Sequence, residues 1–138
     1  MLPDGRINPG QMTSFNHYAL GSVANFLHTV VGGLSPLEPG WKKALIKPQP
    51  GGTLRSAKVT YDSVYGPYAV EWQLSDGGRL KVKASVPPNA GARVELPGIK
   101  EDVGSGEYEW EVKWEAGEWP PKQIKGPTRA HPSDEFVP

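Results

Sequence analysis

The sequence predicts a mainly β protein: an antiparallel β-sandwich of about six to eight strands, preceded by one N-terminal α-helix. Three observations predict this fold. Apolar and polar residues alternate with a period of two through most of residues 57–114, as in strands that bury one face. Glycine (17) and proline (15) are frequent for 138 residues and separate these runs. Apolar residues recur at helical spacing only within residues 14–31.

The composition excludes several classes of function. Fifteen Lys and Arg balance 15 Asp and Glu, so the chain lacks the charge that attracts nucleic acid or an anionic membrane surface. Cysteine is absent, which excludes disulfides and thiolate metal sites. No apolar run reaches the length of a membrane span. We expect neither nucleic acid nor membrane as a partner.

The N-terminus carries no recognisable targeting signal. Residues 1–6 lack the basic segment and apolar core of a secretory signal. The location would be cytoplasmic if Met1 is the true start, and the compartment is otherwise left open.

The predicted helix follows a turn-rich segment, residues 1–11. Thr13 or Ser14 can cap its first turn, and Gly32-Gly33 ends it because glycine readily adopts the left-handed conformation. The helix has about 18 residues, or roughly 27 Å at 1.5 Å per residue. Its small residues indicate close packing, either on the chain's own sheet or on a neighbouring helix outside the chain. Its apolar residues are Phe15, Ala19, Val23, Phe26, Leu27, Val30 and Val31.

A proline-punctuated connection, residues 34–53, leads to the alternating strands. Ala44–Ile46 fits a short strand, which Pro48 should confine to a short or edge position because proline donates no ladder hydrogen bond. Asp76-Gly77-Gly78 is a strong hairpin signal. We expect a first segment at 1–33, a sandwich domain at 34–115, and a mostly disordered or loosely draped tail at 116–138.

Few residues point to catalysis or metal binding. The chain has no phosphate-binding glycine loop, no nucleophile elbow and no cofactor motif, so we expect no cofactor. His17 and His28 are eleven residues apart, nearly on one helix face, but no third metal ligand accompanies them. We therefore expect no metal site.

A row of glutamates invites comparison with catalytic carboxylates. Glu107, Glu109 and Glu111 alternate with apolar residues, which indicates a solvated strand face. Glycosidase carboxylates instead flank the scissile bond within a cleft.

Tryptophans and one polar pair are the remaining candidates for ligand contact. Trp41 and Trp119 lie in loops, where each could stack on a sugar ring. Asn16 and His17, at the start of the helix, either satisfy buried backbone groups or face a ligand, and the residues alone favour capping. The tryptophans expected in the core are Trp72, Trp110 and Trp114.

Several segments together resemble the C-terminal part of the glycoside hydrolase family 78 α-L-rhamnosidases. Residues 4–23, with the run Ser-Phe-Asn-His-Tyr-Ala at 14–19, resemble the last segment of that family's catalytic barrel. The resemblance extends through most of residues 1–115. The segments similar to the crossover and to the C-terminal domain are 40–41, 46–48, 50–52, 65–66, 70–72, 86–89 and 103–108.

The resemblance implies a fold and an activity for the complete enzyme. The family has an (α/α)₆ catalytic barrel followed by an antiparallel β-sandwich. It hydrolyses terminal α-L-rhamnose with inversion, using two carboxylates as general acid and general base. Both carboxylates precede the segment that matches Ser14–His17, so we expect this chain to be inactive by itself. His17 matches a histidine of the rhamnose subsite, and we expect it, with Asn16, to contact the sugar.

Three hypotheses follow. The chain is the C-terminal part of an α-L-rhamnosidase; or it is a stand-alone module that binds rhamnose-containing carbohydrate through Trp41 or Trp119; or its helix docks onto the barrel or another helical partner. An exposed apolar helix would also favour self-association. Exposed Phe or Val residues on the helix would support the need for a partner, whereas a fully covered helix would favour an autonomous domain.

Overall fold

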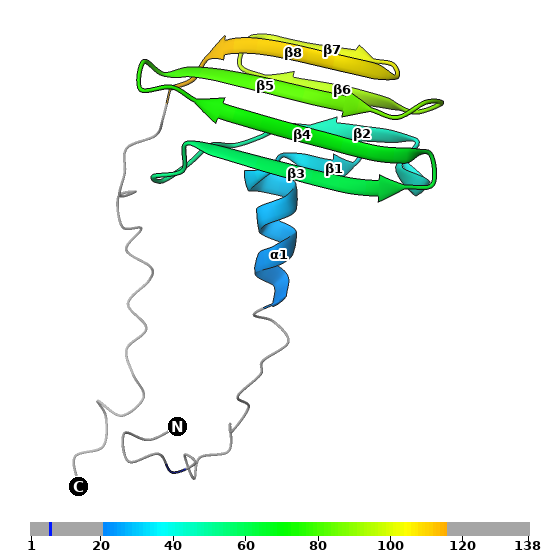
Figure 1. The fold of residues 1–138 in the computed structure, drawn as a ribbon, viewed down its shortest axis with the longest axis horizontal. Coiled ribbons are helices and arrows are strands. Elements are labelled where there is room, and N and C mark those ends of the chain that lie inside the picture. Colours follow the sequence, from blue (N-terminus) through cyan, green and yellow to red (C-terminus); the bar gives the residue numbers. More distant parts are fainter. Residues whose placement is uncertain (1–5, 7–20, 116–138) are drawn as a thin grey trace, which may run out of the picture.

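The computed structural model describes Arg6 and residues 21–115, which form two stacked four-stranded sheets with one projecting helix (Figure 1). This confirms the predicted mainly β sandwich, with eight strands. The sheets have the strand orders β1-β2-β6-β7 and β3-β4-β5-β8. The elements are α1 (Ser22–Phe26), the π-helix η2 (Leu27–Val31), β1 (Leu34–Pro36), the 3₁₀ turn η3 (Pro39–Trp41), β2 (Lys43–Ile46), β3 (Ser56–Ser63), β4 (Gly66–Leu74), β5 (Arg79–Val86), β6 (Gly91–Leu96), β7 (Ile99–Val103) and β8 (Gly106–Lys113).

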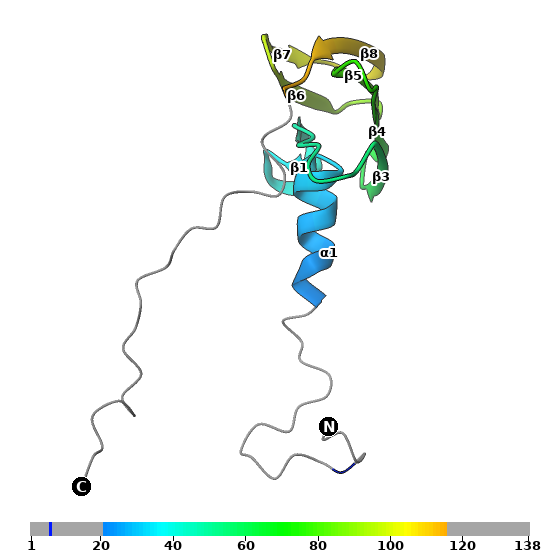
Figure 2. The same cartoon turned by 90° about the vertical axis from the view of Figure 1, so that its left-hand side faces the viewer.

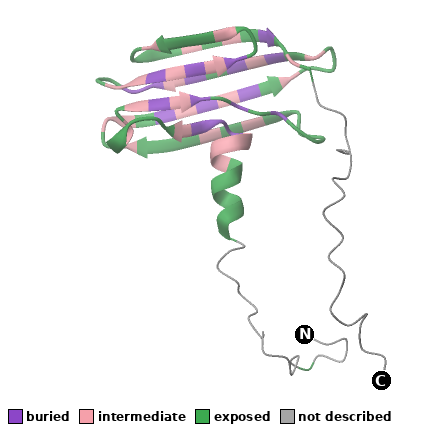
Figure 3. Cartoon of the chain, turned by 180° about the vertical axis from the view of Figure 1, so that it is seen from behind, coloured by how far each residue is buried: buried purple, intermediate pink, exposed green. Residues whose placement is uncertain are grey.

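The core lies between the two sheets and follows from the alternation in the sequence. Successive side chains of a strand point to opposite faces, so every second residue is buried. On β4 and β5 these positions include Tyr68, Trp72, Leu80 and Val82, all with no exposed surface. Figure 3 shows buried and more exposed segments alternating along strands of the sandwich. Burial of this apolar surface is the main force that holds the sheets together.

One strand departs from the predicted topology. β2 is short, with four residues, as the first of the two predicted alternatives requires. It is not an edge strand, because it lies between β1 and β6 and pairs with β6 in parallel. Pro48 does not restrict the strand to an edge, because it lies beyond the end of the strand. The residue before it, Lys47, still donates its N–H to the Gly33 carbonyl at 2.7 Å.

Two strands were not predicted individually. β1 has three residues and ends in Pro36, which is too short to show a period. β7 reads Ile-Lys-Glu-Asp-Val, with its middle three positions exposed, so alternation does not mark it. In the turn before it, Gly98 has φ +78°, and β6 and β7 pair antiparallel across this turn as a hairpin.

The described part of the predicted helix comprises α1 and η2, which project from the sandwich beside β1 and β3 (Figures 1 and 2). The expected start at Thr13 or Ser14 lies outside the described residues. The helix ends where predicted: Gly33 has φ +76°, the left-handed value that favours glycine. A Cβ on Gly33 would also lie 2.1 Å from the Pro48 nitrogen, so the chain can turn here only with glycine.

Candidate functional site

The first half of the described helix exposes apolar side chains. Val23, Phe26 and Leu27 are 56%, 53% and 51% exposed, and we call these three the exposed ridge. The next turn, from His28 to Val31, is partly buried against the sandwich. Figure 3 shows this change along the helix, from exposed at its free end to intermediate at the sandwich. A helix that presents apolar residues to solvent has the character of an interaction surface.

The sandwich supplies hydrogen-bond donors to the last helical turn. The carbonyls that end a helix have no partner within the helix itself. Here the Trp72 indole N–H donates to the Val31 carbonyl at 2.7 Å, and the backbone N–H of Gln49 donates to the Val30 carbonyl at 3.0 Å. The helix end is therefore bonded directly to β4 and to the connection after β2.

An aromatic cluster of His28, Trp41 and Tyr61 surrounds the same end of the helix. The rings of Trp41 and Tyr61 stack at 3.8 Å with 17° between their planes. His28 meets both rings edge-on, at 6.4 Å from Trp41 and 6.1 Å from Tyr61. Its Nδ1 lies 3.0 Å from the Leu34 carbonyl. Because a carbonyl only accepts, this bond requires the proton on Nδ1.

Trp41 has an unusual backbone conformation. Its φ of +63° is uncommon for a bulky residue, and Gly40 before it has φ +68°. Such a conformation persists only where the surroundings hold it. The Tyr68 hydroxyl does so, within 2.8 Å of the Trp41 carbonyl and 3.0 Å of the Gly91 carbonyl. Burial, and then the neighbouring Tyr65, raise the pKa of Tyr68, so the hydroxyl keeps its proton to donate.

The structure places only one of the predicted sugar-contact residues. Trp41 is partly buried, and Tyr61 stacks against its ring, so it is less free to bind a sugar than an isolated loop tryptophan. Asn16, His17 and Trp119 lie outside the described residues, and their roles stay predictions. The expected core tryptophans are confirmed: Trp72 has no exposed surface, and Trp110 and Trp114 pack against the core.

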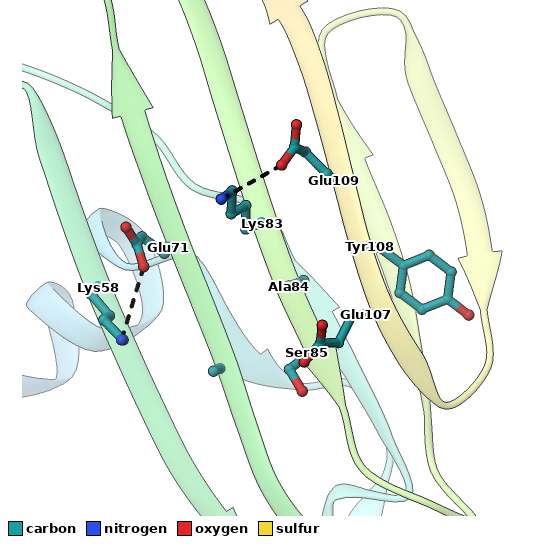
Figure 4. Close-up of a pocket in the computed structure, with 9 residues that line it drawn as sticks. Lys58, Glu71, Lys83, Ala84, Ser85, Glu107, Tyr108 and Glu109 are labelled. Atoms are coloured by element: carbon teal, nitrogen blue, oxygen red, sulfur yellow. Dashed lines mark ion pairs between the residues drawn. The ribbon is translucent and has the colours of Figure 1, made fainter.

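A shallow hollow of about 350 Å³ lies on the outer face of β3-β4-β5-β8 (Figure 4). Its lining combines small residues such as Ala69 and Ser85 with charged side chains. Figure 4 shows the ion pairs Lys58–Glu71 and Lys83–Glu109, at 3.9 and 3.6 Å. The predicted solvated face for Glu107, Glu109 and Glu111 is confirmed, since all three are exposed.

The electrostatics of this face do not favour acid catalysis. A hydrogen bond from Lys81 at 2.8 Å lowers the pKa of Glu109, and Glu109 in turn raises the pKa of Lys81. A general acid at neutral pH needs a carboxyl whose pKa is raised. Glu111 is likewise paired, with Arg79 at 2.8 Å.

Within residues 21–115, no three His, Asp or Glu side chains gather closely enough to hold a metal ion. In the part of the chain that the structure describes, no helix combines the length and the apolar character that crossing a membrane requires.

Sequence reasoning missed the residues that join the helix to the sandwich. Tyr61 lies in the alternating run of residues 57–114, and its stacking on Trp41, twenty positions earlier, has no signal in the sequence. Trp72 was assigned to the core, but the role of its N–H as a donor to the helix end was not foreseen. The one indication in the sequence was that a buried tryptophan usually has an acceptor for its indole N–H.

Comparison with known proteins identifies the domain. Residues 33–114 match the family described as "Bacterial alpha-L-rhamnosidase C-terminal domain". An α-L-rhamnosidase of Streptomyces avermitilis is 41% identical over 95 residues, which cover 69% of this chain and 9% of that protein.

Two crystal structures show the same fold. The α-L-rhamnosidase of Aspergillus terreus is 53% identical, with a TM-score of 0.73 over 81% of this chain and 13% of that one. The Streptomyces avermitilis enzyme complexed with L-rhamnose is 34% identical, with a TM-score of 0.69 over 80% and 13%. The chain thus spans only about a tenth of the length of these relatives. By its sequence and its fold, the chain belongs to the α-L-rhamnosidase C-terminal domain family.

Proposed function

We propose that this chain serves as the non-catalytic C-terminal domain of an α-L-rhamnosidase and docks, through its exposed ridge, onto the helical catalytic region. In the family that region is an (α/α)₆ barrel. The observation that carries the proposal is the contrast along one helix: its end is bonded to the sandwich, while Val23, Phe26 and Leu27 are more than half exposed.

The energetics support a partner at this ridge. Fully burying a side chain such as Val, Leu or Phe is worth about 1.5–3 kcal/mol. Each ridge residue still exposes about half of its surface, so docking would gain on the order of 1 kcal/mol from each. The ridge contains no charged residue that would oppose burial.

The chemistry supports assigning catalysis to the partner. The glutamates on the outer sheet face are exposed, and the pKa of Glu109 is lowered, which is the wrong direction for a general acid. We propose that both catalytic carboxylates come from the barrel. Asn16 and His17 would contact the rhamnose there, as the family resemblance implies.

A chimera tests the proposal. The C-terminal segment of the Aspergillus terreus α-L-rhamnosidase that matches this chain would be replaced by this chain, and hydrolysis of an aryl α-L-rhamnoside would be measured. We expect the chimera to hydrolyse the substrate, and the purified chain alone to show no turnover. Turnover by the chain alone, or a chimera no more active than the enzyme lacking the segment, would reject the proposal.

A second candidate function is a carbohydrate-binding module that uses Trp41 and Trp119. The surface that Trp41 still exposes supports it, although partial burial and the stack with Tyr61 leave less of the ring for a sugar. Calorimetry with rhamnose and rhamnosylated glycans distinguishes the candidates. Heat that disappears in Trp41→Ala would favour a binding module, and no heat at millimolar sugar would reject it.

A further inference from the structure

We propose that the sandwich acts as a clamp on the C-terminal end of the helix, and that Gly32 and Trp72 are positioning residues that fix the direction of the exposed ridge. This inference rests on the proposed function, because the partner that receives the ridge is the helical catalytic region. It adds a role for the sandwich: setting the angle at which the ridge meets that region.

The first part of the clamp is the close approach of Gly32 to β3. A Cβ on this glycine would lie 2.8 Å from Cβ and Cγ1 of Val59, closer than real Cβ contacts occur. Gly32 has φ −69°, which any residue can adopt. Glycine is therefore required here for space, and a side chain would push the helix away from the sheet.

The second part is the set of donors to the last turn. The Gly32 amide bonds to the Leu27 carbonyl at 2.8 Å, which closes the wide π-turn. The carbonyls of Val30 and Val31 then accept from Gln49 and Trp72, as described above. The sandwich holds these donors in fixed positions, so their hydrogen bonds fix the helix in one orientation. Water molecules would satisfy the same carbonyls in many orientations of the helix.

The third part is the contact of His28 with separate elements. Its ring meets Trp41, from the turn before β2, and Tyr61, from β3, and its Nδ1 bonds to the Leu34 carbonyl of β1. The helix end thus contacts β1, β3, β4 and two connections. A displacement of about 1 Å in a catalytic arrangement can lower the rate about a hundredfold. The angle of this helix should therefore affect the activity of the region that it contacts.

Matched alanine substitutions in the chimera test the clamp. Gly32→Ala inserts a methyl group between the helix and Val59, whereas Gly104→Ala inserts one on the sandwich where no atom lies within 4 Å. We expect Gly32→Ala to lose at least about tenfold in rhamnoside hydrolysis, and Gly104→Ala to retain activity. Equal activities of the two variants, in an active chimera, would overturn the inference. An inactive unsubstituted chimera would instead reject the proposed function.

Hydrogen exchange on this chain separates positioning from general stability. Trp72→Phe removes the N–H donor and keeps an aromatic ring, and Trp110→Phe removes the comparable N–H that bonds to Glu101 at 2.6 Å. We expect Trp72→Phe to speed exchange of the Gly32 and Gln49 amides about tenfold, with Val82 less affected. Trp110→Phe should leave Gly32 and Gln49 unchanged. Equal acceleration at all sites in Trp72→Phe would show a core defect and reject the clamp.

Gly21→Ala provides a second comparison within the helix. Gly21 and Gly32 share similar backbone angles, with φ −66° and −69°, but a Cβ at Gly21 meets nothing within 4 Å. Gly21→Ala should leave exchange of the Gln49 amide unchanged, whereas Gly32→Ala should speed it. Unchanged exchange in Gly32→Ala would contradict the close approach on which the clamp depends.

Discussion

The indole N–H of Trp72, on the buried face of β4, donates a 2.7 Å hydrogen bond to the carbonyl of Val31 at the end of the helix. The Trp72 side chain thus packs in the core of the sandwich and also satisfies a backbone carbonyl at the end of the helix. The bond joins residues 41 positions apart and connects the element that carries the exposed ridge to the element that carries the core.

Phe26→Asp should abolish docking without unfolding the domain. Phe26 is 53% exposed, so the isolated chain should change in free energy of unfolding by no more than about 0.5 kcal/mol. A charge at a buried contact is costly, so activity of the chimera and self-association of the chain should both fall. Rhamnoside assays and sedimentation measure the two effects.

Leu54→Asp is the control for that prediction. Leu54 is 44% exposed, but it lies in the connection before β3 and outside the ridge. It should leave both docking and self-association intact. If Leu54→Asp and Phe26→Asp behaved alike, the ridge would have no special role.

The stack of Trp41 and Tyr61 should contribute measurably to stability. Stacked aromatic pairs add about 0.5–1.5 kcal/mol beyond the burial of their surface. A double-mutant cycle with Trp41→Ala and Tyr61→Ala should therefore give a coupling energy in that range. Urea unfolding of the four proteins measures it, and strictly additive effects would show that the rings do not support each other.

The sequence could predict the sandwich because its core depends on local alternation. Tyr68, Trp72, Leu80 and Val82 are buried for the reason that the period of two indicated. β7 was missed because its middle residues are all exposed, and the central place of β2 depends on pairing with β6, which lies over forty residues away. Local patterns carry no information about such pairing.

The candidate site was predicted less completely than the fold. Exposed Phe or Val residues on the helix were one of two outcomes that the sequence left open, and the exposure of Val23 and Phe26 supports the need for a partner. The stack of Trp41 on Tyr61 and the bond from Trp72 to Val31 arise from tertiary packing, and neither has a spacing that can be read along the chain.

Acid should destabilise the domain through its surface carboxylates. Hydrogen bonds from Arg93 and then Lys43 hold the pKa of Asp102 far below its usual range, and Lys47 lowers the pKa of Glu95. A carboxyl whose pKa is lower in the folded than in the unfolded state stabilises above its unfolded pKa, about 4. This contribution is lost as the pH falls through the folded value. Urea midpoints should therefore fall below about pH 4.

Asp102→Asn tests the origin of that dependence. The carboxylate accepts from Arg93 at 2.9 Å and from Lys43 at 2.8 Å, and the amide cannot be ionised. The variant should be less stable than the parent near neutral pH, and the difference should shrink in acid. An undiminished difference at low pH would assign the effect to geometry and not to charge.

Glu109→Gln should leave catalysis by the chimera unchanged. Glu109 is exposed and pairs with Lys81 at 2.8 Å and Lys83 at 3.6 Å, and the hydrogen bond from Lys81 lowers the pKa of its carboxyl. Exposed ion pairs contribute little to stability, so the loss of stability should be small and should diminish in high salt. The pH profile of rhamnoside hydrolysis is the decisive measurement, because a general acid or base shapes it directly. A profile that loses one limb in Glu109→Gln would place catalysis on the sandwich and contradict its assignment to the helical partner.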